Sequence, residues 1–225
     1  MPKKKDNKTM PLGRVFHIYC EGKETEPNYL KGYIADRVPN ELRRLFKLES
    51  TEKNTPVQLV DEAITKKSEV NSKSDTEDTF WVVYDRESPQ KYSDELHDKA
   101  MRKAKKHGIH IALSNVCFEV WILLHFQDTV AQYLDYDNLK RNSPLRDKFR
   151  EAGFSDYDKA EDSFKILSVH VDEARKRAKH LNENTQNCAD SSDNKPYQFN
   201  PYTDVYNLLD MIDKWVCEEN EKKSG

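Results

Sequence analysis

Two apolar, strand-like segments of the sequence end on acidic side chains. Asp85 and Glu87 follow the aromatic and β-branched run 80–84, and Glu21 follows the similar run 14–20. Such runs predict buried strands, and open parallel sheets bind ligands at the carboxyl ends of their strands. Carboxylates gathered there repel one another and favour a divalent cation between them. For residues 85–87 taken alone, a solvated turn is an equally good interpretation.

A fourth acid, Glu119, lies in the most apolar segment of the sequence, 114–126, directly after the predicted strand 109–113. We expect this segment to be a buried helix capped by Ser114 or Asn115. A carboxylate in so apolar a helix is expensive to bury unless it is paired or binds a metal. The preceding strand would end at the same sheet edge as the other acids. We therefore favour a functional role for Glu119 over capping its own helix or pairing with an arginine.

Three further side chains are secondary candidates: Lys23, Glu24 and His125. Glu24, like Glu26, falls at a predicted helix start, where the helix dipole favours acids for purely structural reasons. A single histidine on an apolar helix, such as His125, is more often a hydrogen-bonded core residue. The primary candidates for catalysis and metal binding are Glu21, Asp85, Glu87 and Glu119.

The types of these side chains indicate which metal and which chemistry to expect. Oxygen donors without a nearby Cys or a paired His favour Mg²⁺ or Mn²⁺ over zinc. Two such ions roughly 4 Å apart can activate a water molecule and stabilise the leaving oxygen of a phosphodiester. The sequence contains no G-x-x-x-x-G-K-[ST], G-x-G-x-x-G or G-x-S-x-G motif. Nucleotide hydrolysis on a P-loop and acyl transfer through a serine therefore have no support.

Alternating strand and helix patterns would position these acids. Gly22 permits a sharp turn after the first strand, and Thr25 is predicted to cap the next helix, with Pro27 in its first turn. Thr55 is predicted to cap another helix that starts at Pro56. The alternation predicts right-handed βαβ units and a Rossmann-like, mainly parallel α/β sheet of about four core strands. Strands are predicted at 14–20, 42–49, 80–84 and 109–113, and a helix at 92–107.

From Tyr133 onward the sequence predicts helices and no strands. Thr203 is predicted to cap a final amphipathic helix that runs to Trp215. The other expected elements are short helices at 137–142 and 144–151, a long charged helix at 157–180 and a flexible loop at 182–195.

These patterns divide the chain into three parts. We expect residues 1–12 to form a flexible basic tail, residues 13–130 an α/β core, and residues 131–225 an α-helical extension packed on that core.

The composition indicates a globular protein with free thiols. Hydrophobic residues make up 36%, charged residues 34%, and the net charge is −3, so nucleic-acid binding would need a local basic face or bound metal ions. The four cysteines are widely spaced without a C-x-x-C pair, which favours reduced thiols and a cytoplasmic location. No apolar run approaches the ~20 residues of a membrane span. The Lys-rich start lacks the apolar part of a secretion signal.

Several motifs resemble known families. A strand followed by Glu21-Gly22, and a strand followed by Asp85-x-Glu87, look like the two acidic signatures of Toprim domains. More closely, CEGKETEPNY at 20–29, SNVCFEVWILLHF at 114–126 and NPYT at 200–203 resemble the RloB family over residues 14 to about 215. That family is a Toprim-like group associated with restriction and phage-defence loci, often beside an ATPase partner.

The resemblance implies a Toprim-like core with a metal-dependent, nuclease-type site formed by Glu21, Asp85, Glu87 and Glu119. Glu87 departs from the usual Asp-x-Asp pattern, and its longer side chain would reach a metal differently. The leading hypothesis is a Mg²⁺- or Mn²⁺-dependent nuclease in phage defence, acting on DNA or RNA. The rival hypothesis is a non-catalytic adaptor that binds a partner ATPase through its helical part. A homo-oligomer is compatible with both.

Overall fold

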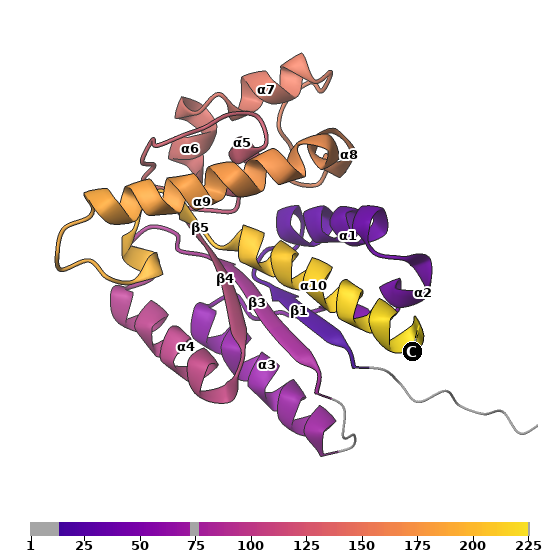
Figure 1. Ribbon diagram of the computed structural model, residues 1–225. Helices are drawn as coiled ribbons and strands as arrows, with labels where there is room; N and C mark the ends of the chain where they lie inside the picture. The colour runs from indigo at the N-terminus through magenta and orange to yellow at the C-terminus, as the bar shows by residue number, and fades with distance from the viewer. Residues whose placement is uncertain (1–13, 73–76, 225) are drawn as a thin grey trace, which may run out of the picture.

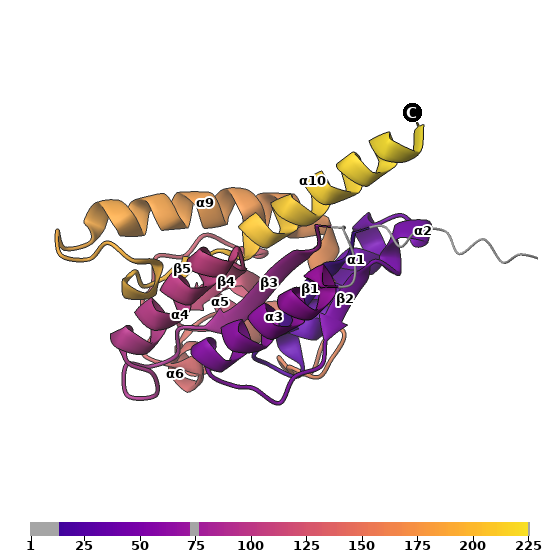
Figure 2. The same ribbon diagram turned by 90° about the horizontal axis from the view of Figure 1, so that it is seen from below.

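The computed structural model describes residues 14–72 and 77–224 and shows an α/β protein built on a mainly parallel sheet (Figure 1, Figure 2). The predicted tail 1–12 lies outside the described residues. Within them, the sheet has five strands in the order β2-β1-β3-β4-β5. Strands β1 to β4 are parallel and β5 is antiparallel to β4, which confirms the predicted fold class. The strands are β1 Phe16–Cys20, β2 Phe46–Glu49, β3 Thr79–Asp85, β4 His110–Asn115 and β5 Tyr202–Thr203.

Helices cover both faces of the sheet (Figure 1). Successive side chains of a strand point to opposite faces, and β1 shows the consequence. Ile18 belongs to the hydrophobic cluster on one face, whereas Tyr19 belongs to the cluster on the other. The first face is covered by α1 (Thr25–Arg37), α9 (Val171–Cys188) and α10 (Val205–Ser224), and the second by α3 (Pro56–Asn71) and α4 (Asp94–His107).

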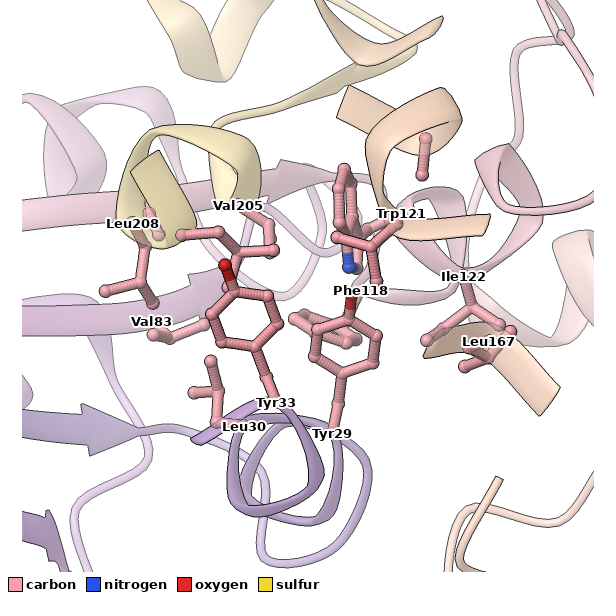
Figure 3. Packing of buried hydrophobic residues seen from close by; sticks show 14 of the residues in the cluster. Tyr29, Leu30, Tyr33, Val83, Phe118, Trp121, Ile122, Leu167, Val205 and Leu208 are labelled. Carbon is pink, nitrogen blue, oxygen red and sulfur yellow. The ribbon is translucent and has the colours of Figure 1, made fainter. Parts of the chain in front are cut away.

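The larger cluster joins the beginning and the end of the chain (Figure 3). Tyr33 on α1 lies near Val205 of α10, and Tyr29 packs edge-on against Phe118, with ring centroids 5.6 Å apart. The cluster draws buried residues from each of β1, β3, α1, α9 and α10. The C-terminal helices therefore share a hydrophobic core with the sheet.

Of the two helix starts predicted by a threonine cap in the core, that of α3 is confirmed and that of α1 is wrong. Thr55 caps α3 by accepting a hydrogen bond from the Gln58 N–H (3.4 Å). Gly108 ends α4 in the left-handed conformation, with φ +63°. Thr25 is not a cap, because α1 already begins at this residue and its Oγ1 donates to Glu119 Oε1 (3.5 Å).

The helix predicted over 114–126 begins later than expected. Strand β4 continues to Asn115, and the helix α5 is confined to Glu119–Leu124. Ser114 Oγ lies 2.9 Å from Thr203 Oγ1 in a buried pair between β4 and β5. Ser114 and Asn115 are therefore strand residues rather than caps, because they pair with a strand that the local pattern did not indicate.

The helix predicted at 157–180 is also wrong. It is replaced by α8 (Phe164–Leu167), the 3₁₀ turn Ser168–His170 and α9. Tyr157 is buried and its hydroxyl donates a hydrogen bond to Glu119. This contact holds the start of the predicted helix in a non-helical conformation ahead of α8. Because α9 continues to Cys188, it also occupies half of the loop predicted at 182–195. The remaining elements are α2 Asn40–Arg43, α6 Tyr136–Asn142, α7 Leu145–Glu151 and the 3₁₀ turn Pro196–Gln198.

Asn182 of α9 holds the short strand β5 in place, and β5 contradicts the expectation of a C-terminal part without strands. The buried side-chain amide of Asn182 donates to Thr203 O (2.9 Å) and accepts from Thr203 N (3.1 Å). Thr203 is thus a strand residue, although its Oγ1 also accepts from Val205 N (3.4 Å) at the start of α10.

Two further predictions concern the environment of the chain. The four cysteines are free, Cys20 and Cys117 being buried and Cys188 and Cys217 exposed, as expected for reduced thiols. Within the described residues, every helix is too short or too polar to cross a membrane.

Replacing Asn182 by Ala should destabilise the protein by about 2–4 kcal/mol, because a buried N–H or C=O without a partner costs about 1–3 kcal/mol. Urea unfolding measures this difference. The matched control is Asn187→Ala, which removes an exposed amide from the same helix. A loss for Asn182→Ala no larger than for Asn187→Ala would show that Asn182 does not hold β5.

Candidate functional site

The neighbouring strands β1 and β3 both end on acids. The chain passes from β1 to β2 on one side of it and then crosses to β3 on the other side, so the strand order reverses between β1 and β3. Ligands of open α/β sheets bind outside the carboxyl ends of the strands at such a switch point. Glu21 directly follows β1 and Asp85 ends β3, and the Asp85 N–H donates to Glu21 Oε2 (3.1 Å). The structure therefore brings these two predicted residues into contact.

Glu87 is held in a strained turn after β3. Its φ of +59° lies in the left-handed region that non-glycine residues rarely adopt. Its N–H donates to Val116 O (2.9 Å), and its Oε1 lies 2.6 Å from Lys91 Nζ. Such strain persists where the surrounding contacts over-determine the conformation. The position of Glu87 is therefore fixed by the fold.

Arg86 anchors this turn from inside the protein. Its side chain is 5% exposed. The guanidinium donates to the carbonyls of Tyr197 (2.9 Å) and Tyr92 (2.9 Å) and to the carboxylate of Asp94 (2.6 Å). The solvated turn that the sequence left open is thereby excluded. This role could not be predicted from local patterns, because the partners of Arg86 depend on the tertiary fold.

Glu119 lies at the start of α5 with its side chain 1% exposed. Its Oε1 accepts a hydrogen bond from Tyr157 OH (2.9 Å) and lies 3.3 Å from Lys159 Nζ. Its Oε2 is buried without a hydrogen-bond partner among the described residues. The pairing with an arginine, considered as an alternative, is replaced by a pairing with a lysine from the C-terminal part of the chain.

Glu26 joins the cluster, although its place near a helix start suggested a purely structural role. Its carboxylate is buried and accepts from the Gly22 N–H (3.3 Å). A Cβ on Gly22 would lie 2.1 Å from Glu26 Oε2. A side chain at position 22 would therefore require the Glu26 carboxylate to move, and Gly22 does not adopt a left-handed turn conformation.

A cavity of about 440 Å³ is lined by the acids of this cluster other than Glu119, which is buried behind it. Of the secondary candidates, Lys23 and Glu24 line it and are exposed. His125 lies elsewhere, fully buried between Tyr29 OH (2.9 Å) and Trp121 O (3.0 Å), where burial lowers its pKa to about 3. It is a neutral core histidine in this structure. The cavity is also lined by Glu21, Glu26, Asp85, Glu87, Lys91 and Lys159.

Burial and mutual repulsion raise the pKa of several of these acids. Loss of solvent, followed by repulsion from Glu26, Glu119, Glu21 and Glu87, raises the pKa of Asp85 well above its ordinary range. Burial raises the pKa of Glu21 to about 7, although the hydrogen bond from the Asp85 backbone opposes the shift. Burial, supported by the charge of Glu119, raises the pKa of Glu26. A nearby cation would relieve this repulsion.

The donor set fits a hard divalent cation such as Mg²⁺ or Mn²⁺. Carboxylate oxygens are the ligands that these ions prefer, and Glu119 Oε2 is buried and free to accept one. Across residues 14–72 and 77–224, no three His, Cys, Asp or Glu side chains are already arranged as the ligands of one ion. The oxygens of Glu21 and Glu87 that now accept hydrogen bonds would exchange them for the cation.

Comparison with known proteins gives one match. A family model described as RloB-like protein matches residues 16–212, which is most of the chain. No curated protein and no solved structure matches the sequence. The matched range includes β1 to β5 and all the acids of the cluster.

In metal-free buffer, the stability of the protein should fall as the pH rises from about 4.5 to about 7, the ordinary and the raised pKa of Glu21. The native state favours the protonated form of an acid whose pKa it raises. The resulting stability is fully present below the unfolded pKa and is lost as the pH approaches the folded pKa. Thermal melts with a chelator at about pH 5 and about pH 7.5 measure the loss.

Glu21→Gln stays neutral throughout this range, so its melting temperature should fall less than that of the wild type. Glu24→Gln, which changes an exposed acid of the same cavity, is the control and should behave like the wild type. Equal losses for the wild type and Glu21→Gln would contradict the placement of Glu21 in a repulsive cluster.

Proposed function

We propose that this chain, which belongs to the RloB-like protein family, is a Mg²⁺- or Mn²⁺-dependent nuclease that hydrolyses phosphodiester bonds of nucleic acid in phage defence. The observation that supports this most is the convergence of acids from three separate strand ends. Glu21 follows β1, Asp85 and Glu87 follow β3, and Glu119 follows β4. Their charges interact around Asp85.

The proposed ligands follow from the electrostatics of the cluster. Asp85 is repelled by four neighbouring acids, so its ionised form gains most from a bound cation. Glu21 contacts Asp85 directly, and Glu119 contributes a buried, unpartnered oxygen. A bound ion would supply an activated water and stabilise negative charge on the phosphate.

Lysines that line the cavity reduce the electrostatic repulsion between the acid cluster and a polyanion. Lys23 and Lys91 line the cavity together with the acids, and Lys91 Nζ lies 2.6 Å from Glu87 Oε1. A phosphate that enters the cavity meets ammonium groups as well as carboxylates, which lowers the repulsion between an acidic site and a nucleic-acid backbone. These ammonium groups, together with a bound cation, support nucleic acid as the substrate despite the net charge of −3.

Asp85→Asn should lower metal-dependent cleavage by roughly a hundredfold or more, since even residues that only support metal ligands affect activity by about 10- to 100-fold. DNA and tRNA are incubated with Mg²⁺ or Mn²⁺, with and without a partner ATPase. Asp98→Asn is the control, because Asp98 pairs with Arg102 on the surface of α4. Equal cleavage by the wild type and Asp85→Asn would reject the proposal. Phage defence that survives Asp85→Asn would favour the adaptor hypothesis.

The same substitution should also change the response of stability to metal. A ligand that binds the native state at a hundredfold excess over Kd adds about 2.7 kcal/mol, so millimolar Mg²⁺ or Mn²⁺ should raise the melting temperature of the wild type. Without metal, Asp85→Asn should be at least as stable as the wild type, because it removes a repelling charge. With metal it should gain little. An undiminished metal response would mean that Asp85 is not a ligand.

A further inference from the structure

The ammonium group of Lys159, from the C-terminal part of the chain, lies at the acid cluster. Lys159 lies between α7 and α8, two residues after the buried Tyr157. Its Nζ is 3.3 Å from Glu119 Oε1 and 3.7 Å from the centre of the Tyr136 ring. Its side chain also lines the cavity that contains Asp85. The ammonium group thus lies between an aromatic ring and a buried carboxylate, at the edge of the proposed metal site.

Glu119 depends on this contact for its compensating charge. Its side chain is 1% exposed, whereas that of Lys159 is 36% exposed. Tyr157 and Thr25 give Glu119 Oε1 neutral hydrogen bonds (2.9 and 3.5 Å). Among the described residues, the ion pair of Glu119 is made with Lys159. Because a buried carboxylate without a counter-charge is strongly disfavoured, this lysine offsets the charge of the Glu119 carboxylate at its buried position.

We infer that Lys159 is the resident counter-ion of Glu119 and that a divalent cation competes with it for this carboxylate. This inference rests on the proposed metal-dependent function. Both cations are attracted by the same cluster of acids, and like charges within a few ångströms repel each other. Binding of Mg²⁺ or Mn²⁺ to Glu119 therefore displaces the ammonium of Lys159.

The segment that carries Lys159 allows this movement without disturbing the core. Tyr157 is buried, and Asp156 accepts hydrogen bonds from Arg146 Nε (2.8 and 3.0 Å) and Nη2 (2.6 Å), so the start of the segment is fixed. Lys159 itself stands on an irregular turn and has a flexible four-carbon side chain. Once displaced, its ammonium remains at the cavity, where a substrate phosphate can bind it. Metal binding would thus free a cation for the substrate.

Calorimetric titration of Mn²⁺ tests the competition. Lys159→Met keeps an unbranched side chain against Tyr136 but removes the competing charge. Its affinity for Mn²⁺ should rise about tenfold, which corresponds to 1.4 kcal/mol. The separate variant Lys159→Arg keeps the positive charge and should bind Mn²⁺ nearly as the wild type does. The control is Lys23→Met, which removes an equal charge from the same cavity without a contact to Glu119. It should change the affinity by less than about threefold, so that a general charge effect is separated from direct competition.

A second measurement uses the wild-type protein and does not depend on how a variant folds. Lysine amines are acetylated with an N-hydroxysuccinimide ester and quantified by mass spectrometry. Lys159 should react several-fold faster with Mn²⁺ present, whereas the exposed Lys176 on α9 should react equally in both conditions.

The outcomes separate this inference from the proposed function. If Mn²⁺ binds the wild type while the reactivity of Lys159 and the affinity of Lys159→Met are unchanged, the competition is overturned and the metal site remains. If Mn²⁺ does not bind the wild type at all, the metal-dependent function is overturned, and the inference with it.

Discussion

Repulsion between carboxylates crowded at the ends of β1, β3 and β4 is the constraint on which the rest of this structure depends. The fold holds these acids together by giving them partners from separate segments. Backbone N–H groups of Asp85 and Gly22 donate to Glu21 and Glu26. Lys159 offsets the charge of Glu119. Burial raises the pKa values of Asp85 and Glu21, and repulsion from the neighbouring acids adds to both shifts. A site of this kind is poised to favour added positive charge.

The helices after residue 130 are part of this arrangement. The segment between α7 and α8 supplies Tyr157 and Lys159 to Glu119. The 3₁₀ turn Pro196–Gln198 supplies the carbonyl of Tyr197 to the guanidinium of Arg86. Asn182 fixes β5, which in turn pairs with the end of β4 just before Glu119. The acid-bearing edge of the sheet and the C-terminal helices therefore stabilise each other. A change in the packing of these helices would be transmitted to the site through Arg86 and Glu119.

The parts of the fold that follow from local patterns could be predicted, and those that rest on distant contacts could not. Apolar runs locate β1 and β3, so Glu21 and Asp85 could be placed at one sheet edge from sequence alone. The two-residue strand β5 has too few residues for a periodic pattern, and without it Ser114 resembled a helix cap. Glu26 carried an equally good local explanation in the helix dipole. Lys159 gave no signal, because its contact with Glu119 joins residues that are far apart in sequence.

The left-handed backbone conformation of Glu87 determines where its carboxylate lies at the cavity. Glu87 stands where an Asp-x-Asp pattern would place an aspartate, and it is the non-glycine residue with positive φ among the described residues. A left-handed conformation costs an L-residue roughly 1–2 kcal/mol. Here the cost is offset by the Val116 carbonyl, which accepts from the Glu87 N–H, and by the buried Arg86 beside it. The turned backbone changes where the longer side chain begins, and Lys91 holds its carboxylate at the cavity. The extra methylene of Glu87 is thus accommodated by a local change of backbone direction rather than by leaving the cluster.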